Sequence, residues 1–214
     1  MKLLRYGPKG QEKPGIVDRD GNVRDLSDLV DDIGGDILTD QGLAGIAEAD
    51  LASLTAVEVD RYGPCVGNVG KFICIGLNYS DHAEESGLAV PLEPVIFAKA
   101  TSAICGPNDT VELPRGSKAT DWEVELGVVI GKQAKYINEA DALDHVAGYC
   151  VINDISERDF QNKRAGQWTK GKSADTFGPI GPWLVTRDEV PDPQNLSMYL
   201  DVNGKRRQDG STNT

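Results

Sequence analysis

The feature that most constrains the fold is the run at residues 121–130, whose first half alternates between polar and apolar side chains. Successive side chains of a β-strand point to opposite faces, so Glu123 and Glu125 share one face while Val124 and Leu126 share the other. Two carboxylates on one face repel each other unless a proton or a cation lies between them. A hard divalent metal with oxygen ligands is the simplest remedy, so the run predicts a strand at a Mg²⁺, Mn²⁺ or Ca²⁺ site.

A solvent-facing strand is the alternative interpretation, because a half-exposed antiparallel strand alternates in the same way and turns both glutamates to water. The apolar run at 127–131 favours a strand that is covered on both sides. A third acidic candidate, Asp154, follows a second apolar run at 148–153, just before a polar stretch that is typical of a helix start. Since Asp is also a favoured N-cap, Asp154 could be a site residue or a cap, and the local sequence leaves both open.

The composition is that of a soluble globular protein, with 26% charged and 39% hydrophobic residues in 214. The net charge of −12 argues against nucleic acid or an anionic membrane surface as a partner. It does not exclude a small anionic substrate, because a metal and local lysines reverse the charge within one pocket. The four cysteines form no CxxC pair, and no apolar signal core or stretch of about 20 apolar residues occurs, so we expect a cytoplasmic protein.

The chain divides near residue 70 into a small N-terminal β-rich domain, 1–70, and a main domain, 71–214. The N-terminal part alternates short strand-like fragments with turn signals and ends in a polar helical stretch at 43–54. In the main domain, strand-like runs follow one another at 72–75, 95–98, 123–130, 149–152, 183–185 and 198–202. Helical patterns are fewer, the clearest being 140–146 and 155–163. The predicted fold class is therefore α+β, with strands dominant.

Two further groups of residues could take part in catalysis. If Ser80 or Asp81 caps a short helix, His82 and Glu85 lie one turn apart on one face and could form a hydrogen-bonded pair that takes a proton from water. A surface histidine among acids is the alternative. Lys172, between a glycine and a serine, could place its ammonium against an oxyanion.

Taken in order, these motifs resemble the fumarylacetoacetate hydrolase family over residues 71–214. The residues that carry the resemblance are Gly76-Leu77-Asn78-Tyr79 with His82 and Glu85, Phe97-Ala98-Lys99, Glu123-Val124-Glu125-Leu126-Gly127, Asn153-Asp154 with Arg158 and Gln161, and Trp168-Thr169-Lys170-Gly171-Lys172-Ser173. The resemblance implies a mixed β-sheet roll and a homodimer. It also implies roles for individual residues: Glu123, Glu125 and Asp154 as metal ligands, His82 and Glu85 as the water-activating pair on a lid, Lys172 as the catalytic lysine, and Arg158, Gln161 and Tyr79 as substrate-binding residues.

The family's chemistry implies hydrolysis of a C–C bond in a small 2,4-diketo acid, an acylpyruvate or a 2,4-diketo-3-deoxy sugar acid, to give pyruvate and a carboxylic acid. Mg²⁺ is the expected cofactor, with Mn²⁺ or Ca²⁺ as alternatives. Isomerase, decarboxylase and ureidoglycolate lyase activities occur on similar scaffolds and stay open here.

This sequence departs from the family's pattern in one respect. The pattern continues beyond the position of Thr214 through a helix, further core strands and a Gly-rich loop. On this basis we expect a C-terminally truncated chain. A sheet without those strands would expose edges and lose part of its core. An inactive, metal-binding homologue is therefore a further hypothesis.

Overall fold

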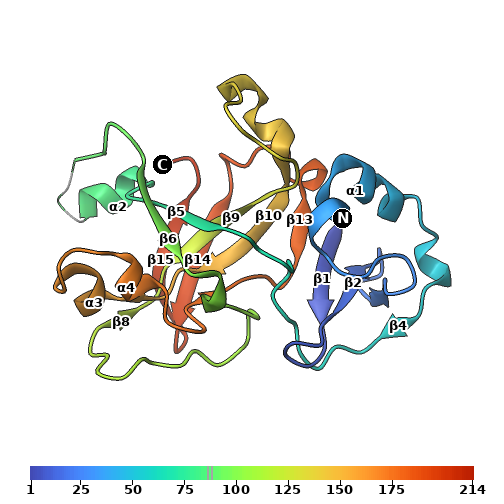
Figure 1. The fold of residues 1–214 in the computed structure, drawn as a ribbon, viewed down its shortest axis with the longest axis horizontal. Helices are drawn as coiled ribbons and strands as arrows, with labels where there is room; N and C mark the ends of the chain where they lie inside the picture. Colours follow the sequence, from blue (N-terminus) through green and yellow to red (C-terminus); the bar gives the residue numbers. More distant parts are fainter. Residues whose placement is uncertain (86, 88) are drawn as a thin grey trace.

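The largest sheet runs through both halves of the chain. We describe the protein from a computed structural model, which covers residues 1–85, 87 and 89–214 (Figure 1). Seven strands pair in the order β4-β3-β2-β1-β13-β10-β9. Their bounds are β4 Ala56–Val57, β3 Val23–Asp25, β2 Lys13–Val17, β1 Lys2–Tyr6, β13 Leu184–Thr186, β10 Val146–Asn153 and β9 Val124–Ile130.

The N-terminal strands join this sheet through β1, which pairs antiparallel with β13 at Lys2↔Val185 and Leu3↔Leu184. The main hydrophobic cluster likewise contains residues from both sides of position 70, among them the fully buried Leu3, Leu26 and Leu184. The division into domains at residue 70 stays a prediction, although the sheet and the core are continuous across that position.

Shorter strand pairs complete the fold. Two of them are antiparallel ribbons, β5 Phe72–Gly76 with β6 Val95–Lys99, and β14 Ser197–Val202 with β15 Lys205–Ser211. The remaining pairs are β7 Ile104–Cys105 with β12 Gly178–Pro179, which is parallel, and β8 Thr120–Asp121 with β11 Ser156–Glu157. In Figure 1 both ribbons lie with β9 and β10 in the middle of the molecule, away from β1 and β2.

The helices are short and lie at the two ends of the molecule. Helix α1 Asp40–Ala47 lies beside the N-terminal strands, whereas α2 Ser80–Glu85, α3 Arg158–Asn162 and α4 Thr169–Lys172 gather at the opposite end (Figure 1). The 3-10 helices are η1 Gly35–Leu38, η2 Leu51–Ser53, η3 Thr101–Ala103, η4 Glu139–His145 and η5 Arg187–Glu189. Within the described ranges, no helix combines the length and the apolar character needed to span a membrane.

The strand-dominated α+β class is confirmed, and each strand predicted in the main domain is present within a few residues. The helix predictions were less accurate. The pattern at 140–146 forms the 3-10 helix η4, and Val146 already opens β10. The stretch 155–163 forms an α-helix only from Arg158, because Ser156 and Glu157 pair with β8. The stretch 43–54 is split between α1 and η2.

The expectation that the run 127–131 is covered on both sides was wrong for the described chain. Strand β9 lies at the edge of the sheet, and the side chains of Val128 and Ile130 are 49% and 56% exposed. Val129 points the other way and packs against the main cluster. One face of β9 is therefore buried and the other is open to solvent.

Candidate functional site

The register between β9 and β10 brings the three predicted acidic residues to one face. Glu125 pairs with Ile152, and the backbone amide of Asp154 donates to the carbonyl oxygen of Glu123 at 2.8 Å. Residues that face each other across antiparallel strands point to the same side, as do residues two apart on one strand. Glu123, Glu125 and Asp154 therefore share a face, as the alternation of residues 121–130 predicts for the glutamates.

Glu125 has an environment that opposes its negative charge. Burial, together with the nearby carboxylates of Glu123 and Asp154, raises the pKa of its carboxyl group to about 8. Among the described residues, no lysine, arginine or histidine lies within ion-pair distance of Glu125. A proton or an additional cation is therefore needed to stabilise this group at neutral pH.

Two buried lysines neutralise the other acids. The Nζ atom of Lys172 lies 2.5 Å from Oε2 of Glu123 and 2.5 Å from Oδ2 of Asp154. The Nζ atom of Lys99 lies 2.6 Å from Oδ1 of Asp154 and donates to the carbonyl oxygen of Ile155 at 3.0 Å. Burial by itself would raise the pKa of Asp154, but the charges of Lys99 and Lys172 outweigh it and hold the pKa below its usual range.

Lys99 reaches the centre of the site, although no role was predicted for this residue from the sequence. Lys99 ends β6, and its residue exposure is only 2%. It lies on the same strand face as Val95 and Phe97, which are partly buried, whereas Ile96 is exposed. That alternation was the available signal, because a lysine in register with inward apolar residues is unusual unless it has a buried partner.

Arg158 and Gln161 lie on α3 beside Glu123. The guanidinium of Arg158 donates to Oε1 of Glu123 at 2.5 Å, to Oδ2 of Asp121 at 2.9 Å and to Oε1 of Gln161 at 3.1 Å. Gln161 is buried, while the Arg158 side chain is 30% exposed at the edge of the group. Both residues thus lie beside the acids, Arg158 holds the second oxygen of Glu123, and their substrate-binding roles stay predictions.

Close packing around α4 carries Lys172 to the acids. A Cβ atom added to Gly171 would lie 2.5 Å from the carbonyl oxygen of Glu157 and 2.6 Å from the amide nitrogen of Gln161. On its other side, the helix contacts β6, because Trp168 packs edge-on against Phe97 with ring centroids 5.4 Å apart. The glycine therefore lets α4 approach α3 closely enough to bury the Lys172 side chain.

The predicted water-activating pair lies in α2, the short helix that follows β5. His82 and Glu85 are one turn apart and exposed, and the described hydrogen bonds include none between their side chains. Tyr79 lies just before the helix, and burial together with the charge of Glu125 raises the pKa of its hydroxyl to about 12. Tyr79 is thus near the acids, and the roles of His82 and Glu85 stay predictions.

The acidic group fits a divalent metal in its chemistry, since Mg²⁺, Mn²⁺ and Ca²⁺ all accept carboxylate oxygens. In the part of the chain that the structure describes, no three His, Cys, Asp or Glu side chains are already arranged as a metal site. The Lys172 ammonium lies between Glu123 and Asp154 and keeps their oxygens engaged. A metal held by Glu123, Glu125 and Asp154 therefore requires Lys172 to move.

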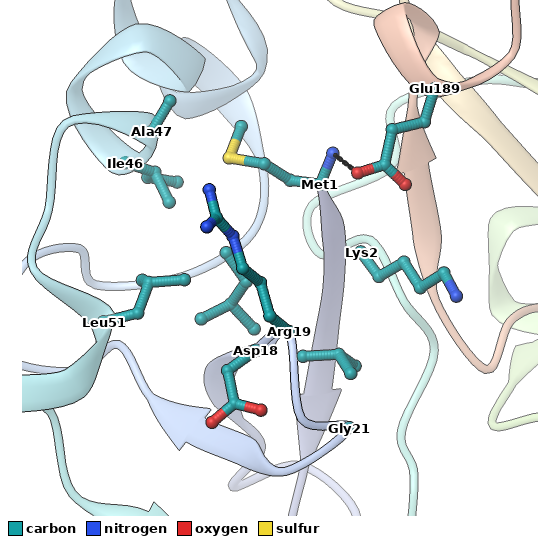
Figure 2. Close-up of a pocket in the computed structure, with 11 residues that line it drawn as sticks. Met1, Lys2, Asp18, Arg19, Gly21, Ile46, Ala47, Leu51 and Glu189 are labelled. Carbon is teal, nitrogen blue, oxygen red and sulfur yellow. Dashed lines mark ion pairs between the residues drawn. The ribbon is translucent and has the colours of Figure 1, made fainter.

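A separate cavity of about 510 Å³ lies near the N-terminus, between β1, β2 and α1 (Figure 2). Met1, Arg19, Ile46 and Leu51 are among its lining residues, and the amino group of Met1 forms an ion pair there with Glu189. None of the nine predicted site residues lines it. The cavity is therefore distinct from the acidic site.

Comparison with known proteins identifies the family. The family profile described as fumarylacetoacetate (FAA) hydrolase C-terminal matches residues 71–214. A Burkholderia multivorans protein named only as a hydrolase is 65% identical over 215 residues, which is 100% of this chain and 76% of that protein.

Solved structures agree with this assignment. The fumarylacetoacetate hydrolase of Exiguobacterium antarcticum is 33% identical with a TM-score of 0.84, covering 100% of this chain and 76% of that one. The maleylpyruvate hydrolase of Sphingobium sp. SYK-6, solved with manganese(II) and pyruvate, is 30% identical with a TM-score of 0.80, covering 100% and 77%. A 5-carboxymethyl-2-hydroxymuconate delta-isomerase of Mycobacterium smegmatis is 32% identical with a TM-score of 0.74, covering 100% and 76%. The chain belongs to the fumarylacetoacetate hydrolase family.

Proposed function

We propose that this chain is a divalent-metal-dependent hydrolase that cleaves a C–C bond in a small 2,4-diketo acid and releases pyruvate. The observation that carries the proposal is the shared face of Glu123, Glu125 and Asp154, with Lys172 buried against two of them. The similar maleylpyruvate hydrolase, whose structure contains manganese(II) and pyruvate, supports the choice of metal and product.

The three carboxylates would hold the metal, which supplies Lewis-acid chemistry to the 2-oxo acid end of the substrate. Arg158 lies at the exposed edge of the acidic group, where its guanidinium can bind the substrate carboxylate. Gln161 supports Arg158 through the hydrogen bond to its side chain. Tyr79, next to Glu125, can position the substrate from the side of α2.

His82, assisted by Glu85, would take a proton from water as the water oxygen bonds to the carbonyl carbon at position 4. The bond between carbons 3 and 4 then breaks, so that carbon 4 leaves in the carboxylic acid. Carbon 3 keeps the electron pair in the enolate of pyruvate. The Lys172 ammonium can donate to the enolate oxygen, where negative charge develops, before carbon 3 takes up a proton. Both residues of the pair are exposed on α2, and we expect this helix to close over bound substrate before the proton transfer.

The test is pyruvate release from a panel of acylpyruvates and 2,4-diketo-3-deoxy sugar acids, with Mg²⁺, with Mn²⁺ and with EDTA. We expect metal-dependent release that His82→Ala and Lys172→Met abolish. Lys170→Met is the matched control, because Lys170 lies on the same helix but is exposed, and its described side-chain hydrogen bond goes to the carbonyl oxygen of Arg164 and not to the acids. Release that persists in EDTA, or in Lys172→Met, would contradict the proposal.

Isomerisation is the second candidate, because the similar structures include isomerases named for 5-carboxymethyl-2-hydroxymuconate and for 2-hydroxyhepta-2,4-diene-1,7-dioate. An isomerase would change the absorbance of a 2-hydroxy-dienedioate without releasing pyruvate. The same assay with both substrate classes therefore separates the two activities. Metal binding without either activity would favour an inactive homologue.

We further propose that the protein is a cytoplasmic homodimer. All four cysteines are free thiols in the structure, which fits a reducing compartment. Sedimentation velocity on the purified chain tests the dimer, and a single monomeric species at micromolar concentration would exclude it.

A further inference from the structure

Two ammonium groups bind opposite oxygens of one carboxylate. Lys99 contacts Oδ1 of Asp154 at 2.6 Å, and Lys172 contacts Oδ2 at 2.5 Å. Asp154 itself is only 5% exposed, and both lysines are only 2% exposed. The carboxylate is therefore fixed from both sides, and the two ammonium groups account for its ionised state.

The two lysines differ in their other partners. Lys99 also donates to the carbonyl oxygen of Ile155 at 3.0 Å, so one of its bonds does not depend on any carboxylate. The remaining hydrogen bond of Lys172 goes to Oε2 of Glu123, a second carboxylate oxygen. Every hydrogen bond that the structure describes for the Lys172 ammonium is thus made to an oxygen of the acidic group.

A cation that binds Oδ2 of Asp154 and Oε2 of Glu123 competes with Lys172 for both of its acceptors. The same cation does not compete with Lys99, whose two acceptors are Oδ1 of Asp154 and a backbone carbonyl. Lys99 can remain in place and keep the Asp154 side chain turned so that Oδ2 faces the site. A partner outside the ligand set that orients a ligating carboxylate typically changes metal affinity about 10–100-fold.

We propose that Lys99 is a positioning residue that orients Asp154 for cation binding, while Lys172 competes with the cation for the same carboxylate oxygens. Two buried lysines on one carboxylate then have opposite effects on cation affinity. The inference rests on the metal site of the proposed function, but it concerns binding rather than turnover. It also implies that cation binding frees the Lys172 ammonium to contact substrate.

The experiment measures the dissociation constant of Mn²⁺ without substrate, by electron paramagnetic resonance of free Mn²⁺, at a temperature where each variant is folded. We expect Lys99→Met to weaken binding by about 10–100-fold. We expect Lys172→Met to tighten it by about tenfold, because a competing positive charge has been removed. Lys170→Met, the exposed control, is expected to leave the constant unchanged. Lys99→Arg keeps both the charge and the donor, and is expected to restore most of the affinity lost in Lys99→Met.

The sign of the change separates the alternatives. If Lys99 only balances charge, Lys99→Met removes a positive charge near the cation and tightens binding, which would overturn the proposal. If Lys99 only stabilises the fold, the melting temperature falls and the Mn²⁺ constant of the folded variant is unchanged, which would overturn it as well. Should Lys99→Met fail to fold, Lys99→Gln, which keeps a shorter neutral donor, is expected to weaken binding, and unchanged or tighter binding would overturn the proposal.

The proposed function can fail independently. A parent protein that binds Mn²⁺ with the expected variant effects but releases no pyruvate would leave the inference standing and refute the hydrolase. If the protein releases pyruvate but Lys99→Met and Lys172→Met change the Mn²⁺ dissociation constant in the same direction, the hydrolase proposal stands and the inference is refuted. A parent that binds no Mn²⁺ would refute both.

Discussion

At the scale of single residues, Glu157 is a buried acid that is stabilised in its ionised form by donors and not by a cation. Burial opposes the charge, but the hydrogen bonds outweigh it and lower the pKa to about 2. The donors are the Ser117 and Thr120 hydroxyls and the backbone amides of Lys118, Ala119 and Asp159. This network ties the segment 117–120 to the start of α3, the helix that carries Arg158.

We predict that Glu157→Gln destabilises the protein by about 1–3 kcal/mol at pH 7, because one of the two acceptor oxygens is replaced by an NH2 group, which cannot accept from the buried donors. The pKa of the folded state lies below the ordinary value of 4.5, so the contribution of Glu157 is fully present above about pH 4.5 and is lost as the pH falls toward 2. The measurement is the thermal midpoint of parent and variant between pH 3 and 7. The difference should shrink at the acidic end, and exposed Glu58→Gln should show no such difference.

Glu125 is the opposite case, because its environment opposes the ionised form and this charge lowers the stability of the folded protein. Its folded pKa of about 8 lies above the ordinary 4.5, so it lowers stability progressively as the pH rises from about 4.5 to 8. We predict that Glu125→Gln raises the thermal midpoint in EDTA at pH 9 and has little effect at pH 4.5. A variant that is less stable than the parent at pH 9 in EDTA would contradict this explanation.

Sequence patterns were most informative for residues whose role follows from their own strand. Glu123 and Glu125 were predicted to share a face because the strand period is two. For Lys99, the alternation of β6 indicates only that the side chain points inward, because the partner that stabilises it there is Asp154, which lies 55 positions away in the chain. Local alternation can therefore indicate a buried lysine but cannot identify its distant partner.

At the scale of elements, the position of α4 depends on the missing side chain of Gly171. We predict that Gly171→Ala lowers stability by about 1–3 kcal/mol, because the added methyl group overlaps backbone atoms of Glu157 and Gln161. It should also reduce pyruvate release, since α4 carries Lys172. Gly45→Ala in α1 is the control, because no described atom outside the neighbouring backbone of α1 lies within 4 Å of the place its added methyl group would take, and alanine favours a helix. Equal effects of the two substitutions would argue against close packing at Gly171.

Strands were predicted more accurately than helices for a physical reason. The predicted strands of the main domain are short runs rich in apolar residues, which can be recognised even where alternate side chains are exposed, as in β6 and β9. Helices such as α3 and α4, with five and four residues, are too short to show a helical period. Their boundaries are set by contacts, for example the pairing of Ser156 and Glu157 with β8.

At the scale of the whole molecule, the N-terminal strands and the site share one sheet. The sequence suggested a break near residue 70, because the spacing of strands and turns changes there. It could not predict that β1 pairs with β13, since these strands lie near opposite ends of the chain. Strand pairs with such large sequence separation leave no local pattern.

The shared core predicts that the chain unfolds as one cooperative unit. Leu3 is fully buried in the cluster that contains Cys150 and Leu184, so Leu3→Ala is expected to cost about 2–5 kcal/mol. Because the cluster contains residues of β1, β2 and β10, and Val129 of β9 packs against it, hydrogen exchange of the β9 and β10 amides should accelerate together with that of β1 and β2. Leu29→Ala is the control. That side chain is 48% exposed, so the substitution should change neither the free energy of unfolding nor the hydrogen exchange of these amides. Unchanged protection in β9 and β10 of Leu3→Ala would instead establish that the two halves unfold independently, as separate domains do.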